Sequence, residues 1–305
     1  MGKVVLLQAA KRLSTQFGYS SIQLREAIPY IREFQDKVMV VKVGGSILND
    51  DDGDLTAQRT FLEDVIFMAQ IGIRAVLVHG GSYQLSRRMR EEGLSPAVRQ
   101  GERYTDAPTL SLAVEVFNRI NSEIVEAIKA LGGRAIGFRA GKDCLIYAER
   151  KHKDPNNFVG KVTKVDADRL RALKKGYIPV LTCIGFGEGQ LFNVNADEVA
   201  SRVALALRAE KVILLTNVDG VKDEKGSLIS TLTQSRAKRL ISSGIVDAGM
   251  VPKVRVCLEA LEAGVTKAHI INGATEGSLL CEVLSESGVG TELVKAKARR
   301  VRASG

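Results

Sequence analysis

Short valine-rich apolar runs alternate along this chain with longer segments of helical periodicity. The runs carry no polar alternation, which is typical of parallel strands covered on both faces. Strands are expected at Val38–Val43, Ala75–Val78, Ile178–Ile184, Lys211–Leu215, His269–Ile271 and Thr291–Val294. Helices are expected at Leu55–Gln70, Tyr83–Glu92, Leu110–Ala130, Asp197–Leu207, Ser235–Ser242 and Val254–Ala263. This alternation predicts an α/β fold, a three-layer sandwich with a mostly parallel central sheet.

Two glycine pairs follow the first two predicted strands directly. Gly44-Gly45 follows Val43, and Gly80-Gly81 follows a strand that ends at Val78 and His79. A glycine turn after a strand lets backbone N–H groups approach phosphate oxygens, because no Cβ intervenes. One such pair alone is more simply an ordinary turn between a strand and a helix. Two pairs, with Lys42 interrupting the apolar strand before the first, favour an anion site at the carboxyl ends of the strands.

Three further charged residues are candidates for the same site, and each also has a structural interpretation. Lys253 precedes a predicted helix, so it either reaches the anion or is an ordinary N-terminal lysine. Asp197 opens another predicted helix, where it either complements the helix dipole or holds the two lysines in register. Arg103 lies in a polar loop; its guanidinium suits a carboxylate, but a surface salt bridge with Asp106 or Glu102 is an equal alternative.

Composition narrows the classes of protein that need to be considered. The 305 residues carry a net charge of +9, which favours anionic partners, and the basic tail at 295–302 lacks the aromatic residues expected of a nucleic-acid site. No apolar stretch is long enough to span a bilayer. The four cysteines are widely spaced and read as free thiols in a reducing compartment. We therefore expect a cytoplasmic protein with neither membrane nor nucleic-acid partners, although residues 3–17, an amphipathic helix pattern without acidic residues, also leave a transit signal open.

These motifs resemble those of the amino-acid kinase family, and within it the acetylglutamate kinases, from about Leu24 to Val294. The resemblance rests on the segments Leu24–Tyr30, Lys42–Gly45, Arg103–Asp106, Phe192–Asp197 and Gly249–Lys253. It implies ATP-dependent phosphorylation of the γ-carboxylate of N-acetyl-L-glutamate in arginine biosynthesis, with Mg²⁺ bridging the ATP phosphates and no metal ligand from the protein. A carboxylate acceptor is already an anion at neutral pH, so no general base is required.

The resemblance also assigns roles to individual residues. Catalytic roles fall to Lys42, Lys253 and Asp197. Acceptor binding falls to Gly80, Gly81, Arg103, Asn193 and Asn195. ATP binding falls to Gly44, Gly45 and Asp219. The sequence departs from the family pattern where Ser82-Tyr83 replaces the usual Gly-Pro, and where Asn217 and Asn272-Gly273-Ala274 replace Asp and Asp-Gly-Arg.

The resemblance further divides the chain and suggests regulation. We expect an N-terminal helix extension at 1–23, an acyl-amino-acid-binding lobe at 24–190, a nucleotide-binding lobe at 191–295 and a basic tail at 296–305. Such an extension implies a homo-oligomer, a hexamer if the helices interlace, inhibited by arginine bound between this helix and Glu282–Gly290. The alternatives are a kinase with another acceptor, such as N-blocked aminoadipate or a nucleotide monophosphate, and a non-catalytic arginine sensor.

Overall fold

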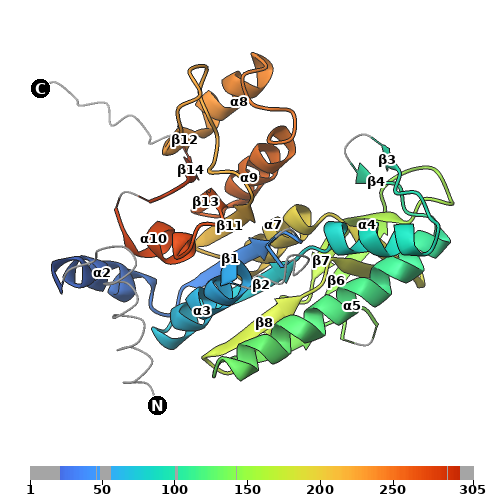
Figure 1. The fold of residues 1–305 in the computed structure, drawn as a ribbon, viewed down its shortest axis with the longest axis horizontal. Helices are drawn as coiled ribbons and strands as arrows, with labels where there is room; N and C mark the ends of the chain where they lie inside the picture. Colours follow the sequence, from blue (N-terminus) through green and yellow to red (C-terminus); the bar gives the residue numbers. More distant parts are fainter. Residues whose placement is uncertain are drawn as a thin grey trace, which may run out of the picture.

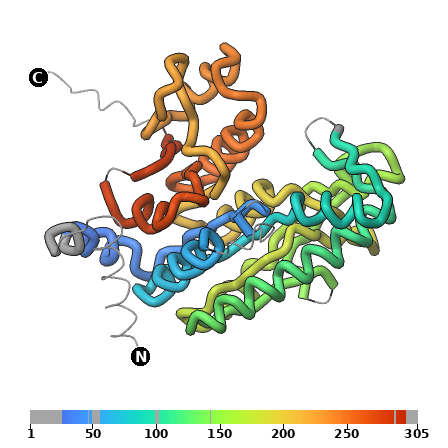
Figure 2. The backbone as a smooth tube through the Cα atoms, in the orientation of Figure 1, coloured from blue at the N-terminus to red at the C-terminus, as the bar shows by residue number. Residues whose placement is uncertain are grey.

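The computed structural model describes residues 21–45, 47–48, 56–99, 102–141, 143–286 and 288–295. The predicted helix at 3–17, most of the predicted extension at 1–23, and the basic tail at 296–305 therefore lie outside the described residues. Figure 1 shows the arrangement of the elements, and Figure 2 traces the same chain as a tube. Among the described helices, none combines the length and the apolar character needed to cross a membrane.

An eight-stranded sheet forms the centre of the molecule. Its strands, in spatial order, are β12 (Thr231–Thr233), β14 (Thr291–Val294), β13 (Lys267–Asn272), β11 (Lys211–Thr216), β1 (Val38–Val43), β2 (Arg74–His79), β8 (Tyr177–Leu181) and β5 (Arg134–Phe138). The six strands from β13 to β5 are parallel to their neighbours, and β14 pairs antiparallel with β13. The mostly parallel sheet is confirmed.

Helices cover both faces of this sheet. One layer holds α2 (Ser21–Phe34), α3 (Thr56–Gln70), α4 (Ser82–Glu91), α5 (Ala107–Ala130) and α10 (Ser278–Leu284). The other layer includes α7 (Ala196–Leu207) and α9 (Val251–Ala263), which pack on each other and on β11 (Figure 1). The remaining helices are α6 (Ala167–Arg171) and α8 (Gln234–Ser242). All six residues of β11 are buried, as expected for a strand between two helical layers.

A smaller set of strands sits beside the end of the central sheet. β6 (Ile146–Arg150), β7 (Val159–Val165), β9 (Ile184–Gly187) and β10 (Gln190–Val194) close into a barrel, and β3 (Val98–Arg99) pairs with β4 (Glu102–Arg103). The single strand predicted at Ile178–Ile184 was therefore wrong, because the chain leaves the central sheet after Leu181 and enters the barrel at Ile184. The predicted lobe boundary at residue 190 falls at the start of β10, which pairs with β7 and β9; the division into lobes stays a prediction.

Two helices begin three residues earlier than predicted, and both shifts concern candidate residues. Helix α5 begins at Ala107 because the Asp106 carboxylate caps it, accepting a hydrogen bond from Thr109 N at 3.0 Å. Helix α9 begins at Val251 rather than Val254, with Pro252 in its first turn, where the missing N–H costs nothing. Lys253 consequently lies inside the first turn of α9, not before it.

Candidate active site

The two glycine turns meet at one edge of the central sheet because β1 and β2 are adjacent and parallel. A cleft of about 230 Å³ opens there. It is lined by nine of the eleven predicted site residues: Lys42, Gly44, Gly45, Gly80, Gly81, Arg103, Asn193, Asn195 and Asp197. The cleft thus combines residues that are far apart in sequence: they come from β1, β4, β10, α7 and the turns that follow β1 and β2. This is the position that the rule for the carboxyl ends of parallel strands predicts.

Lys42 and Asp197 form an ion pair within the cleft. Lys42 Nζ lies 2.8 Å from Asp197 Oδ1, and the two side chains are only 12% and 13% exposed. Lys42 projects from β1, whereas Asp197 lies in the first turn of α7, which packs on β1. A lysine that interrupts a buried strand therefore does have a carboxylate partner. Its ammonium is held at the cleft wall, where an incoming anion meets a fixed positive charge.

Gly81 is fixed by packing rather than by an unusual backbone conformation. A Cβ at this position would lie 2.6 Å from Phe117 Cδ1 and 2.8 Å from Ile120 Cδ1, both on α5. At Gly80 a Cβ would meet only ordinary contacts, the nearest being Ala196 Cβ at 3.7 Å. Gly81 is also the N-cap of α4, and Ser82, the first residue of that helix, lines the cleft, so the positive end of the helix dipole lies at the cleft.

The first glycine turn is held by a side chain from α4. Gln84 Nε2 donates to Gly45 O at 2.9 Å and to Leu48 O at 3.3 Å. A Cβ on Gly45 would lie 2.5 Å from Gln84 Oε1, so a larger residue here would displace the glutamine amide from its present position. The carbonyl of Gly44 accepts from Ile47 N at 3.2 Å. The turns after β1 and β2 are thus tied together through one glutamine.

His79, the last residue of β2, is structural rather than a proton carrier. It is fully buried, and burial lowers its pKa from 6.5 to about 4. Its Nδ1 lies 3.1 Å from Gly80 O, and its Nε2 lies 3.3 Å from Asn121 Nδ2. A carbonyl only accepts and an amide nitrogen only donates, so the neutral ring carries its proton on Nδ1. His79 therefore orients the Gly80 carbonyl.

Arg103 makes no ion pair with any described residue. Its Nη2 donates to Ser82 O at 3.0 Å, and its Nε is buried without a hydrogen-bond partner. The predicted alternative, a salt bridge with Asp106 or Glu102, was wrong: Asp106 caps α5, and Glu102 pairs with Lys151 Nζ at 2.6 Å. Burial lowers the pKa of Arg103, which shows that its charge is poorly solvated. The guanidinium also donates to Met89 Sδ through Nη1 at 3.2 Å and to Ser86 Oγ through Nη2. A partly buried guanidinium that has no carboxylate partner among the described residues fits a carboxylate ligand.

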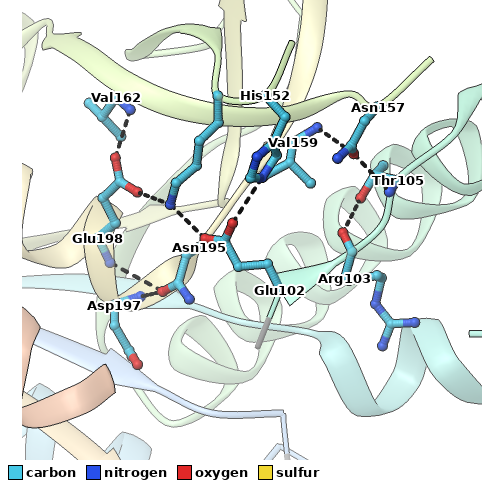
Figure 3. A network of polar contacts seen from close by, with 11 residues as sticks. Glu102, Arg103, Thr105, His152, Asn157, Val159, Val162, Asn195, Asp197 and Glu198 are labelled. Carbon is cyan, nitrogen blue, oxygen red and sulfur yellow. Dashed lines mark hydrogen bonds and ion pairs between the residues drawn. The ribbon is translucent and has the colours of Figure 1, made fainter. Parts of the chain in front are cut away.

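The two asparagines of the cleft differ in what their side chains do, as Figure 3 shows for Asn195 and its neighbours. Asn195 caps α7, since its Oδ1 accepts from Asp197 N at 2.8 Å and from Glu198 N at 3.3 Å. Asn195 therefore sets the start of the helix that carries Asp197. Asn193 Nδ2 donates to Thr105 Oγ1 at 3.0 Å, leaving its side-chain oxygen for another donor.

Two predicted site residues do not line this cleft. Lys253 Nζ donates to Gly249 O at 3.4 Å and has no ion pair with Asp197 among the described residues. Helix α9 nevertheless packs on α7, the helix that carries Asp197. The charge of Asp197 accordingly adds to burial in raising the pKa of the Cys257 thiol on α9. Asp219 is exposed beyond β11 and accepts a hydrogen bond from Asn272 at 3.0 Å. Both positions stay predictions as phosphate and nucleotide contacts.

Several cleft residues were not predicted as site residues, among them Phe117, Val159, Cys183 and Ala196. Each is an apolar or weakly polar residue with the pattern of a core position, so no local signal distinguishes it. Burial raises the pKa of the Cys183 thiol to about 12, with Lys42 opposing the shift only in part. Within the described part of the chain, no group of three His, Cys, Asp or Glu side chains is placed to hold a metal ion.

The family model described as "Amino acid kinase family" matches residues 37–272. The chain belongs to this family. An acetylglutamate kinase of Kosmotoga olearia is 42% identical over 273 residues, covering 88% of this chain and 95% of that protein. An acetylglutamate kinase of Pelobacter propionicus is 40% identical over 287 residues, covering 89% and 97%.

The chain is also similar to the solved structure of an enzyme that is not named as a kinase. The N-acetylglutamate synthase of Neisseria gonorrhoeae, complexed with coenzyme A and N-acetyl-glutamate, matches with a TM-score of 0.81 at 29% identity, over 91% of this chain. The same synthase with coenzyme A and L-arginine matches with a TM-score of 0.78 at 27% identity. This chain spans 64% of the synthase in the first of these structures, so the likeness concerns part of that enzyme.

Proposed function

We propose that this amino acid kinase transfers the γ-phosphoryl group of ATP to the γ-carboxylate of N-acetyl-L-glutamate. The observation that carries the proposal is the cleft itself, which is lined by Lys42, by two glycine turns and by Arg103, a cation with no carboxylate partner among the described residues. The named kinases that the chain resembles are matched over nearly their whole length, whereas the synthase is matched over 64% of its length. This difference favours a catalytic kinase over a regulatory domain.

In the proposed reaction, the protein positions two anions and compensates their charge. Arg103 binds the α-carboxylate of the acceptor, and the free oxygen of Asn193 accepts a hydrogen bond from its amide. The γ-carboxylate then lies near the N-terminus of α4 and Lys42. A carboxylate with a pKa of about 4 is ionised at neutral pH, so it attacks the γ-phosphorus directly, and the bond from that phosphorus to the β,γ-bridging oxygen breaks to release ADP. The N–H groups of the glycine turns and the Lys42 ammonium stabilise the negative charge on the transferring phosphoryl oxygens.

ATP enters as its magnesium complex, and we assign its polyphosphate to the Gly44–Gly45 side of the cleft. Lys253, in the first turn of α9, approaches the phosphates from the opposite layer, and Asp219 lies at the nucleotide wall beyond β11. Asp197 fixes the Lys42 ammonium and does not itself contact either substrate. No step needs a general base, and neutral His79 serves to orient the glycine turn.

Trapping of the acyl phosphate with hydroxylamine tests this function. We expect hydroxamate from ATP, Mg²⁺ and N-acetyl-L-glutamate, and at least tenfold less from the N-acetylated aminoadipate, whose chain is one methylene longer. Lys42→Met is expected to lower turnover at least a hundredfold. The control is Lys175→Met, which removes an exposed lysine paired with Asp36 at 2.6 Å and should retain full turnover. Wild-type turnover in Lys42→Met would contradict the mechanism.

We also propose feedback inhibition by arginine. The segment predicted for the inhibitor contains a buried carboxylate: Glu282 Oε1 lies 2.6 Å from His269 Nδ1, and Glu282 Oε2 accepts from Val289 N at 2.7 Å. Helix α10, which carries Glu282, packs on α2 (Ser21–Phe34), so the segment predicted for the inhibitor lies beside the first described helix. The related synthase was solved with L-arginine, which supports the proposal.

Arginine inhibition and the oligomeric state are measured together. We expect millimolar arginine to inhibit the wild type, Glu282→Gln to lose this response, and light scattering to report a hexamer. A protein that is a monomer or simple dimer and is insensitive to arginine would rule out this regulation without affecting the proposed reaction.

The four cysteines, all free thiols, fit a reducing compartment such as the cytoplasm.

A further inference from the structure

The strand that carries Arg103 is held by side chains outside the cleft. Its neighbour Glu102 accepts contacts from the loop between β6 and β7, where Lys151 Nζ lies 2.6 Å from Oε1 and His152 Nε2 lies 3.2 Å from Oε2. Tyr104 OH donates to Asp154 Oδ2 at 3.0 Å in the same loop. The segment around β3 and β4 and the loop after β6 lie side by side at one end of the molecule (Figure 2).

Lys151 also reaches the helix that carries Asp197. Its Nζ lies 3.8 Å from Glu198 Oε2, and Glu198 directly follows Asp197 in the first turn of α7. Glu198 is held on two further sides: Oε1 accepts from Val162 N at 2.8 Å, and its backbone N–H is capped by Asn195. Figure 3 shows the carboxylates of Glu102 and Glu198 within one polar network. One ammonium thus joins the neighbour of Arg103 to the neighbour of Asp197.

The charges explain why this ammonium matters. The side chains of Lys151, Glu102 and Glu198 are 32%, 22% and 16% exposed, so solvent screens them only in part. Without Lys151, the two carboxylates lose their shared counterion and repel each other. Glu102 also lines the cleft beside Arg103. Without a counterion, the negative charge of Glu102 would weaken the binding of a negatively charged acceptor.

We propose that Lys151 is a positioning residue, which holds Arg103 in register with the Lys42–Asp197 pair by bridging Glu102 and Glu198. It contacts neither substrate. Its effect is on the affinity for the carboxylate-bearing acceptor, because Arg103 recognises that molecule, and not on phosphoryl transfer itself. This inference rests on the proposed function, since it assumes that Arg103 binds the acceptor.

Steady-state kinetics of Lys151→Met test the split between binding and chemistry. We expect the KM for the acceptor to rise about fivefold, which is the effect expected from losing a partly exposed network of ion pairs. The kcat and the KM for ATP should stay within about twofold of the wild-type values. Adding Glu102→Gln to Lys151→Met should recover part of the lost affinity for the acceptor, because it removes the negative charge of Glu102 that no longer has a counterion. Lys161→Met, an exposed lysine on β7, is the matched control and should change nothing.

Hydrogen exchange supplies a readout that does not depend on turnover. In Lys151→Met, the backbone amides of 102–105 should exchange faster than in the wild type, while those of β1 and β2 stay protected. Unchanged exchange at 102–105, or an acceptor KM equal to that of the wild type, would overturn the proposal. A wild-type protein that forms no acyl phosphate would instead refute the proposed function, and the exchange result would still decide the role of Lys151.

Discussion

Protonation of His79 is expected to destabilise the folded protein at mildly acidic pH. The ring is fully buried, and desolvation lowers its pKa from 6.5 to about 4. Because the folded pKa lies below the unfolded one, the unfolded chain binds the proton first as the pH falls. The contribution of the neutral His79 ring to the free energy of unfolding is therefore fully present above about pH 6.5. It decreases between about pH 6.5 and 4 and is lost below the pKa of the folded protein.

The size of the effect follows from this shift. At pH 5 the imidazole of the unfolded chain is almost fully protonated, whereas about one tenth of the folded protein carries the proton. The difference corresponds to about 2 kcal/mol of unfolding free energy at pH 5, and to about 3 kcal/mol below pH 4. A loss of this size is a large fraction of the stability of an ordinary domain.

Urea unfolding of the wild type and of His79→Asn at pH 7 and pH 5 measures this pH-dependent loss of unfolding free energy. The asparagine amide keeps a donor toward Gly80 O but does not titrate. Other groups, including His269, whose pKa burial also lowers, titrate in both proteins and cancel in the comparison. We expect the loss of free energy between the two pH values to be smaller in the variant by about 2 kcal/mol. An equal loss in the two proteins would refute the assignment of a neutral, buried His79.

Three further predictions concern the cleft. Gly81→Ala should cost about 1–3 kcal/mol in urea unfolding, because its Cβ would lie 2.6 Å from Phe117 Cδ1, whereas Gly80→Ala should cost less than about 1 kcal/mol; equal losses would contradict the packing argument. Arg103→Lys should raise the KM for the acceptor about tenfold or more in steady-state kinetics, since lysine lacks the bidentate fork, and an unchanged KM would count against a carboxylate at this position. Cys183 should resist iodoacetamide at pH 8 in the native protein, as followed by peptide mass spectrometry, because burial raises its pKa to about 12; rapid labelling would show an ionised thiol.

The local sequence was sufficient to predict the elements that carry most of the site. Valine-rich runs ending in glycine pairs specify strands with open turns at their carboxyl ends, and the parallel arrangement brings those turns together. Lys42 was recognisable because a charge in a buried strand requires a partner. Its partner proved to be Asp197, whose position in the first turn of a helix is also a local property.

What the sequence did not determine depends on contacts between distant segments. The apolar run at 178–184 looks continuous, yet it divides between the central sheet and the barrel, since both environments bury the same residues. Phe117 and Cys183 have no local signal, and only the packing of α5 and the strand order place them at the cleft. The neutrality of His79 likewise arises from burial, and the bridge formed by Lys151 from two segments that meet only in three dimensions. Periodicity and turn chemistry act between near neighbours, so a sequence reveals them; burial and electrostatic partners are set by tertiary packing, so only the fold decides them.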